Sequence, residues 1–263
     1  MCRNTYPPTC IKETLDIKLT QEGINEDQFK KSFRDLALKT PKSSSKLFFN
    51  QLFGGRHSKA VLGDLLAVLL NNSMATYKIA GAQVLVEKEV LSKVCSLIGY
   101  DKNAGGTFPT GGSMSNFMSL VMARDKADVE IKEKGVFKRL IAYSSESGHY
   151  SISKNASFAG IGKQNVRYIE TDEYGKINIL KFKNQIDKDL SNGFIPFYLN
   201  ATAGTTVMCA FDSVLELSKI CQKHNIWLHL DGAFGGGVIF SKKYKYLVEG
   251  IGLTNSFCFN AHK

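Results

Sequence analysis

The stretch Ile226-Trp227-Leu228-His229-Leu230-Asp231 decides the fold that we expect for this chain. Its side chains are largely apolar on both sides of an extended backbone, which is typical of a parallel strand buried between two layers of helices. The run Phe194-Ile195-Pro196-Phe197-Tyr198-Leu199 has the same character. Polar and glycine residues follow both runs, and ligands collect beyond the carboxyl ends of such strands.

Around these two runs, strand and helix patterns alternate along the second part of the chain. We predict strands near 105–109, 139–144, 166–170, 194–201, 226–231 and 256–260. We predict helices near 112–127, 149–160, 178–191 and 213–224. This alternation predicts a doubly wound α/β fold, with a mainly parallel sheet and helices on both of its faces.

The first part of the chain has a different pattern. Residues 1–22 are polar and contain prolines, which favours an extended arm. Phe29, Phe33 and Leu36 recur at helical spacing, and we predict helices near 25–39, 58–71 and 83–98. We therefore expect an N-terminal arm and helix over residues 1–45, and a large domain over residues 46–263.

Composition narrows the class of protein. The net charge is +10, but the lysines are scattered among acidic and aromatic residues, so we expect a solvated surface and no nucleic-acid partner. The six cysteines form no C-x-x-C pair and no metal-ligand spacing with the five histidines. We therefore expect no metal site, no disulfide framework and a reducing, cytoplasmic location. No signal peptide is visible, and the longest apolar run, residues 60–70, is too short to span a bilayer.

Three segments that follow predicted strands carry possible ligand-binding groups. Gly111-Gly112-Ser113 opens a helix, where free N–H groups and a hydroxyl suit a phosphate, although Gly-Gly is also an ordinary turn. This segment is not a P-loop, because no Gly-Lys-Ser/Thr ends it. His149 can stack on an aromatic ring or simply cap a loop. The segment Asn200 to Thr206 offers hydroxyl donors, or forms a Thr-rich turn.

Asp231 and Lys263 complete the candidate site. Singly, a terminal lysine is usually a solvated chain end, and an aspartate at a strand end is usually a cap. Together they match the needs of pyridoxal 5'-phosphate (PLP) chemistry, in which a lysine is the nucleophile and a carboxylate pairs with the pyridine nitrogen.

The order of these motifs resembles the group II PLP-dependent decarboxylases of fold-type I, especially their glutamate and cysteine-sulfinate decarboxylase branch. The similar segments include Phe48-Phe49-Asn50-Gln51-Leu52 and Thr76-Tyr77-Lys78 to Glu87, so the resemblance runs from about residue 45 to the end. The motifs that carry it are Gly111-Gly112-Ser113, Ser145 to Ser151, Ala201 to Thr206, Trp227 to Asp231 and Asn260-Ala261-His262-Lys263.

The resemblance implies a role for each matching residue. Lys263 corresponds to the lysine that bonds PLP, Asp231 to the carboxylate at the pyridine nitrogen, and His149 to the stacking imidazole; these three are the candidate catalytic residues. Gln51 corresponds to a substrate-contacting position in a segment that reaches the active site at a homodimer interface. Further cofactor contacts fall on Gly112, Ser113, Thr206, Ala233 and His262.

Three positions depart from the family pattern. Members usually have proline where this chain has Ala261, alanine where it has Gly232, and tryptophan or tyrosine where it has Phe234. We expect the first two changes to loosen the backbone around the cofactor without removing a reacting group.

The implied reaction is decarboxylation of an acidic L-amino acid to its amine and carbon dioxide. Glutamate is the first expectation, with cysteine sulfinate or aspartate as other substrates. The alternatives are another fold-type I PLP enzyme, such as an aminotransferase or an aldehyde-forming lyase, and an inactive fragment or binding protein. A Rossmann nucleotide-binding protein is disfavoured, because no G-x-G-x-x-G follows the first strand.

The resemblance also implies that the large domain is incomplete. The family places a seventh, antiparallel strand after the lysine, between the strands that we predict at 105–109 and 256–260, followed by a C-terminal small domain. We therefore expect both strands to face a gap and the small domain to be missing from this chain.

Overall fold

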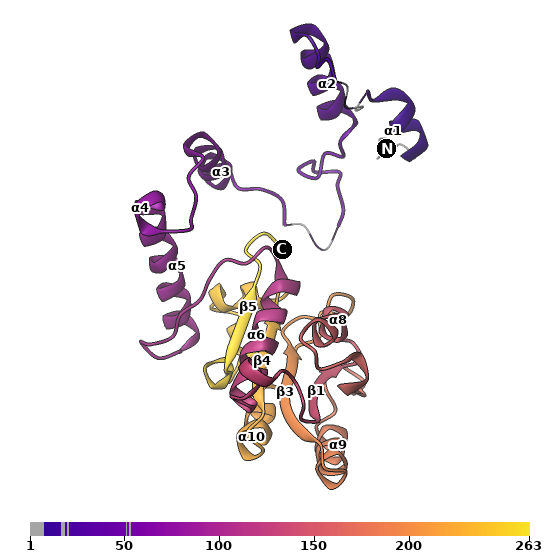
Figure 1. Cartoon of the computed structure of the whole chain (residues 1–263), viewed down its shortest axis with the longest axis vertical. Coiled ribbons are helices and arrows are strands. Elements are labelled where there is room, and N and C mark those ends of the chain that lie inside the picture. Colours follow the sequence, from indigo (N-terminus) through magenta and orange to yellow (C-terminus); the bar gives the residue numbers. More distant parts are fainter. Residues whose placement is uncertain (1–7, 17–18, 20, 51, 53) are drawn as a thin grey trace. The chain divides into compact units, whose positions relative to one another are not determined.

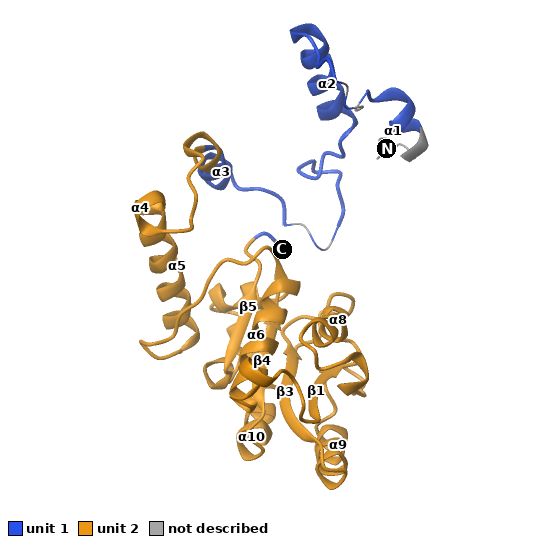
Figure 2. Ribbon diagram, viewed as in Figure 1, with its two compact units in different colours: residues 1–65, 262 blue, residues 66–261, 263 orange. Residues whose placement is uncertain are grey.

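A computed structural model describes residues 8–16, 19, 21–50, 52 and 54–263 (Figure 1). These residues form two compact units (Figure 2). One contains the described residues up to Leu65 with His262, and the other contains residues 66–261 with Lys263.

The helices of the first hundred residues are α1 (Pro8–Thr14), α2 (Glu26–Lys39), α3 (Ser58–Leu70), α4 (Tyr77–Ala80) and α5 (Ala82–Ile98). Helix α1 corrects our expectation of an extended arm: Pro8 is its first residue, and proline is favoured at a first helical position because its fixed φ is already helical. A capping box begins α2, in which Asn25 and Gln28 exchange side-chain to backbone hydrogen bonds of 2.9 Å.

Strands and helices alternate through the rest of the chain. The α-helices are α6 (Gly112–Ala127), α7 (Ile131–Lys134), α8 (Ser151–Phe158), α9 (Ile179–Ser191) and α10 (Val214–Lys223). The strands are β1 (Leu140–Ser145), β2 (Val166–Ile169), β3 (Ile195–Thr202), β4 (Trp227–Gly232) and β5 (Ser256–Phe259). Short 3-10 helices are η1 (Lys163–Asn165), η2 (Gly236–Phe240), η3 (Lys245–Val248) and η4 (Ile251–Leu253).

Among the described residues, the strands form one sheet of order β2-β1-β3-β4-β5, in which every pair of neighbours is parallel. Successive residues of a strand point to opposite faces. In β1, Leu140 and Ala142 pack with α6 and α8, whereas Ile141 and Tyr143 pack with α9 and α10. Helices therefore cover both faces, as the doubly wound prediction requires (Figure 1).

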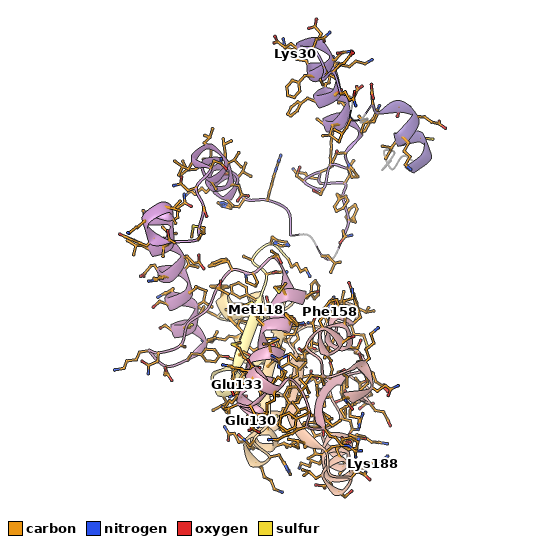
Figure 3. The ribbon with its side chains drawn as sticks, in the orientation of Figure 1. Lys30, Met118, Glu130, Glu133, Phe158 and Lys188 are labelled. Carbon is orange, nitrogen blue, oxygen red and sulfur yellow. The ribbon has the colours of Figure 1, made fainter. Side chains whose placement is uncertain are left out.

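The side chains of this sheet and its helices pack closely, and charged residues such as Glu130, Glu133 and Lys188 are exposed on the outside (Figure 3). The buried cores on the two faces are separate clusters, with the sheet between them.

The predicted strand at 105–109 is wrong. Residues 104–109 have no regular structure, and Phe108 is exposed. The segment contains Gly105, Gly106 and Pro109, which all disfavour strands. Among the described residues β5 is an edge strand of the sheet, and the segment 104–109 does not pair with it.

No helix among the residues that the structure describes is both long enough and apolar enough to cross a membrane.

Candidate active site

A pocket lies where β3, β4 and the N-terminus of α6 meet. Its lining residues are Gly112, Ser113, Asn116, Ser147, His149, Thr202, Gly204, Thr205, Thr206, Asp231, Ala233, Phe234 and Lys263. The structure thus brings together the sequence-predicted residues Gly112, Ser113, His149, Thr206, Asp231, Ala233 and Lys263. Segments far apart in the sequence meet here because the carboxyl ends of parallel strands share one edge of the sheet.

Two predicted site residues are not in this lining. Gln51 lies outside the described residues. His262 belongs to the other compact unit, where its carbonyl oxygen accepts a hydrogen bond of 3.2 Å from the Gly54 N–H. The roles of both residues remain predictions.

A larger cavity of about 260 Å³ lies elsewhere, among residues of α6, α10 and the start of β4. Its lining includes Lys126, Cys221 and Trp227 but none of the predicted site residues. The chemistry points to the smaller pocket, because that is where the carboxylate, imidazole and amine side chains converge.

The N-terminus of α6 forms one wall of the pocket. The first N–H groups of a helix have no acceptor within the helix, and no described side chain caps them here. Gly112 is required by close packing, because a Cβ atom at this position would lie 2.9 Å from Ala233 Cβ. Asn155 Nδ2 donates 3.0 Å to the carbonyl of Ser113 and so fixes the first turn. This wall can bind an anion.

Asp231 supplies a buried carboxylate. Its Oδ1 accepts 3.0 Å from the Ala233 N–H, and its Oδ2 accepts 2.6 Å from Asn116 Nδ2. A buried charge is tolerated only when it is paired or hydrogen-bonded, and both oxygens of this carboxylate are. The carboxylate is thus available to stabilise a cationic group of a ligand.

His149 is half-buried and held in one orientation. Its Nδ1 lies 3.2 Å from the Ser151 N–H, a donor, and 2.8 Å from Ser151 Oγ. Burial lowers the pKa of His149, with the charge of Asp231 opposing this change and that of Lys263 adding to it. A neutral ring whose Nδ1 accepts carries its proton on Nε2 and presents an uncharged flat face.

The end of β3 adds hydroxyl groups. Thr202 Oγ1 is buried and has no hydrogen-bond partner within the part of the chain that the structure describes. The buried Asp212 fixes the backbone here, because its Oδ2 accepts 2.7 Å from the Thr202 N–H and its Oδ1 accepts 2.7 Å from the Ile177 N–H. Burial raises the pKa of Asp212 to about 6, although these two bonds lower it.

Sequence reasoning did not find Asn116, Ser151 or Thr202. A usable signal existed for Asn116, because it follows Gly112 and Ser113 by one helical turn and so shares their face of α6. Ser151 and Thr202 belong to predicted ligand-binding segments, but the residues assigned roles in those segments were His149 and Thr206. Nothing in the sequence shows that the Thr202 hydroxyl lacks a partner, since this depends on the packing of β3.

Gly232 does not loosen the backbone as we expected. A Cβ atom there would lie 2.6 Å from the Phe257 ring, 2.8 Å from the Cys258 carbonyl oxygen and 2.8 Å from Gly236 Cα. The residue belongs to β4 and is paired in register with Phe259 of β5. In this chain a glycine is needed there because three neighbours approach it closely.

A profile of the pyridoxal-dependent decarboxylase conserved domain matches residues 8–263. The chain belongs to this family of PLP-dependent amino-acid decarboxylases.

Individual relatives agree with this assignment. The chain is 37% identical over 259 residues to the acidic amino acid decarboxylase GADL1 of Mus musculus, covering 98% of this chain and 47% of that protein. It is 37% identical over 258 residues to the cysteine sulfinic acid decarboxylase of Homo sapiens, covering 97% and 52%. The chain therefore spans about half the length of these relatives.

Solved structures share the fold. The crystal structure of mouse CSAD superposes with a TM-score of 0.94 at 36% identity, covering 98% of this chain and 55% of that one. The tryptophan decarboxylase of Catharanthus roseus, at 24% identity, shares the fold with a TM-score of 0.88 and covers 100% and 58%. The α/β architecture is thus the large domain of this family.

Proposed function

We propose that this chain carries the PLP site of a decarboxylase that acts on an acidic L-amino acid. The observation that supports this most is the meeting of Asp231, His149 and Lys263 in one pocket beside the N-terminus of α6. Each side chain alone has an ordinary structural explanation. Their convergence with an anion-binding helix end matches the groups that PLP requires.

The residues present fit the cofactor. The free N–H groups of α6, Ser113 and Thr206 would hold the phosphate, and the unpartnered Thr202 hydroxyl offers a further donor. The ring would lie between His149 and Ala233. Lys263 would bond the cofactor, with His262 adding a contact.

When bound, PLP supplies an electron sink for the bond to the departing carboxylate. The protein's contribution is electrostatic and geometric. The buried carboxylate of Asp231 would keep a proton on the pyridine nitrogen, because a carboxylate beside a titrating nitrogen favours its charged form. The neutral ring of His149 would cover one face of the cofactor ring. Because it carries no positive charge, it would not compete with the pyridine nitrogen for the Asp231 carboxylate.

The acidic substrate is the finer part of the proposal. Support comes from the resemblance to the glutamate and cysteine-sulfinate branch and from relatives named as acidic amino acid and cysteine sulfinic acid decarboxylases. Glutamate is the first candidate, with cysteine sulfinate and aspartate next, and Gln51 is the proposed substrate contact.

We also propose that the protein acts as a homodimer. None of the residues of α3 is buried, although Leu62, Leu65, Leu66, Val68 and Leu69 are large and apolar. An apolar helix of this kind needs a partner surface. We propose as well the domain boundary between residues 45 and 46 and a cytoplasmic location.

The test is product analysis on the whole gene product with added PLP. L-glutamate, L-aspartate and L-cysteine sulfinate are supplied separately, with L-tryptophan as the control, and carbon dioxide and the organic product are measured. We expect carbon dioxide and an amine from an acidic substrate only. A keto acid in place of the amine, preference for tryptophan, or a protein that binds PLP without turnover would each overturn the proposal.

A further inference from the structure

Asn116 occupies the centre of a buried hydrogen-bond network beneath the pocket. Its Nδ2 lies 2.6 Å from Asp231 Oδ2 and 3.2 Å from Ser151 Oγ, and its Oδ1 lies 3.0 Å from His229 Nε2. The side chain is about 1% exposed, so water does not provide alternative partners. A single amide thus joins α6 to β4 and to α8.

The orientation of this amide follows from Asp231. An ionised carboxylate only accepts hydrogen bonds, so the NH₂ group of Asn116 must face it and the carbonyl oxygen must face His229. That oxygen lies 3.0 Å from His229 Nε2 and 3.5 Å from Cys258 Sγ, a weak donor. Two acceptors would repel each other at 3.0 Å, so His229 Nε2 carries a proton. Burial lowers the pKa of His229 to about 4, with Asp231 and a backbone hydrogen bond at Ser256 opposing, so the ring is neutral near pH 7. With the proton on Nε2, Nδ1 is the acceptor.

The far side of His229 agrees with this assignment. Its Nδ1 lies 2.8 Å from Ser256 Oγ, which must therefore donate its single proton to the ring. Ser256 Oγ in turn accepts 2.8 Å from Trp227 Nε1–H, a group that only donates. The sheet register places His229 opposite Ser256, so pairing of β4 with β5 fixes this contact.

The other arm of the network reaches His149. Ser151 Oγ accepts from Asn116 Nδ2, which leaves its own proton for His149 Nδ1 at 2.8 Å. The backbone N–H of Ser151 points to the same nitrogen at 3.2 Å. Both histidines are therefore expected to carry their proton on Nε2.

We propose that Asn116 is a positioning residue, whose amide orients Asp231 directly and His149 through Ser151, in a hydrogen-bond chain that starts at Trp227. The expected effect of Asn116 on catalysis rests on the proposed function. The assignment of the His149 and His229 protons to Nε2 does not. Among the described residues, Asn116 is the side chain with a hydrogen bond to Asp231 Oδ2; Cys258 Sγ, a weak donor, lies 3.6 Å from Oδ1. Without Asn116, Oδ2 loses this bond, and the carboxylate is held at Oδ1 alone, by the Ala233 N–H and Cys258.

The first test needs no cofactor and no activity. Histidine labelled with ¹⁵N in the whole protein is measured by long-range ¹H–¹⁵N NMR at neutral pH, and His149→Gln and His229→Gln assign the two signals. We expect both rings to be neutral with the proton on Nε2. A proton on Nδ1 of His229, or a charged ring, would overturn the inference even if the enzyme is a decarboxylase.

The second test compares Asn116→Ala and Asn116→Asp with Ser119→Ala, a control one turn further along the buried face of α6. Removing a hydrogen bond to a charged group should lower kcat roughly ten- to a hundredfold in Asn116→Ala at every pH. Ser119→Ala also loses two buried hydrogen bonds, to Tyr198 and to the backbone carbonyl of Asn116, but it leaves the Asn116 side chain in place and should retain wild-type kcat.

Asn116→Asp separates positioning from packing. It keeps the size of the side chain but can donate to Asp231 only when the two carboxyl groups share a proton. The ratio of its kcat to that of the wild type should therefore fall as pH rises, and its affinity for PLP should follow. A ratio that stays constant with pH, or wild-type activity in Asn116→Ala, would overturn the proposal; failure of the wild type to decarboxylate would instead overturn the proposed function.

Discussion

Replacing Gly232 with alanine tests whether the packing at the carboxyl end of β4 is as tight as the structure shows. The added methyl group would meet the Phe257 ring at 2.6 Å, and the Cys258 carbonyl oxygen and Gly236 Cα at 2.8 Å. The ring can rotate away. The two backbone contacts cannot be relieved without moving β5 or η2, because Gly232 is paired with Phe259.

The expected loss of stability combines two effects. Overpacking of a close-packed interior typically costs about 1–3 kcal/mol. Replacing glycine with alanine also restricts the unfolded chain, which returns roughly 0.4–1 kcal/mol. We therefore expect the free energy of unfolding to fall by about 1–2 kcal/mol, or Tm by about 2–8 °C for a domain of this size.

Trp227 provides the assay, because it is the one tryptophan of the sequence and lies in β4. Denaturant unfolding is followed by its fluorescence in Gly232→Ala and in the matched control Gly237→Ala. A Cβ atom at position 237 meets nothing within 4 Å, so the control should be neutral or slightly stabilised. Equal stability of the two variants would refute the close-packing argument for Gly232.

Three further predictions concern the pocket. Asp231→Asn should lower kcat by roughly a thousandfold or more while PLP affinity changes far less, since an electrostatic contribution to the barrier is lost but the phosphate wall remains; near-normal turnover in steady-state assays would contradict this role. His229, with its pKa lowered from 6.5 to about 4, should make the wild type lose stability as pH falls from about 6.5 to about 4, because the unfolded chain binds the proton first. His229→Gln should lack this contribution, and urea unfolding curves whose difference from the wild type does not vary with pH would argue against it. Thr202→Val should leave the stability of the cofactor-free protein unchanged within about 0.5 kcal/mol, or raise it, because no described bond of its buried hydroxyl is lost; it should weaken PLP binding measured by absorbance titration, and unchanged affinity would show that the hydroxyl serves no ligand.

Much of the fold could be predicted because its central strands are encoded by local hydrophobic pattern. The runs at 194–199 and 226–230 became β3 and β4, and the helices between the strands lie close to their predicted positions. The prediction at 105–109 is wrong because Gly105, Gly106 and Pro109 disfavour a strand and no strand of the described sheet pairs with the segment. Strand pairing is a non-local property, and no pattern within five residues encodes it.

The order of the motifs predicted the residues of the candidate site. It did not predict the packing and hydrogen bonds that hold those residues in place. Gly112, His149 and Asp231 lie in distinctive local sequences, so they could be placed in one pocket beforehand. Gly232 was interpreted as a loosening substitution, because the close approach of Phe257 and Gly236 is visible only in three dimensions. Asn116 was overlooked for a similar reason: its partners Asp231, Ser151 and His229 are distant in the sequence.

The most direct test of the central claim is to identify the lysine that bonds the cofactor. The whole protein is incubated with PLP, reduced with borohydride and digested, and the pyridoxyl group is located by peptide mass spectrometry. The account predicts the label on Lys263, with Lys263→Ala as the unlabelled control. A label on another of the chain's lysines, or equal labelling of the Lys263→Ala variant, would contradict it.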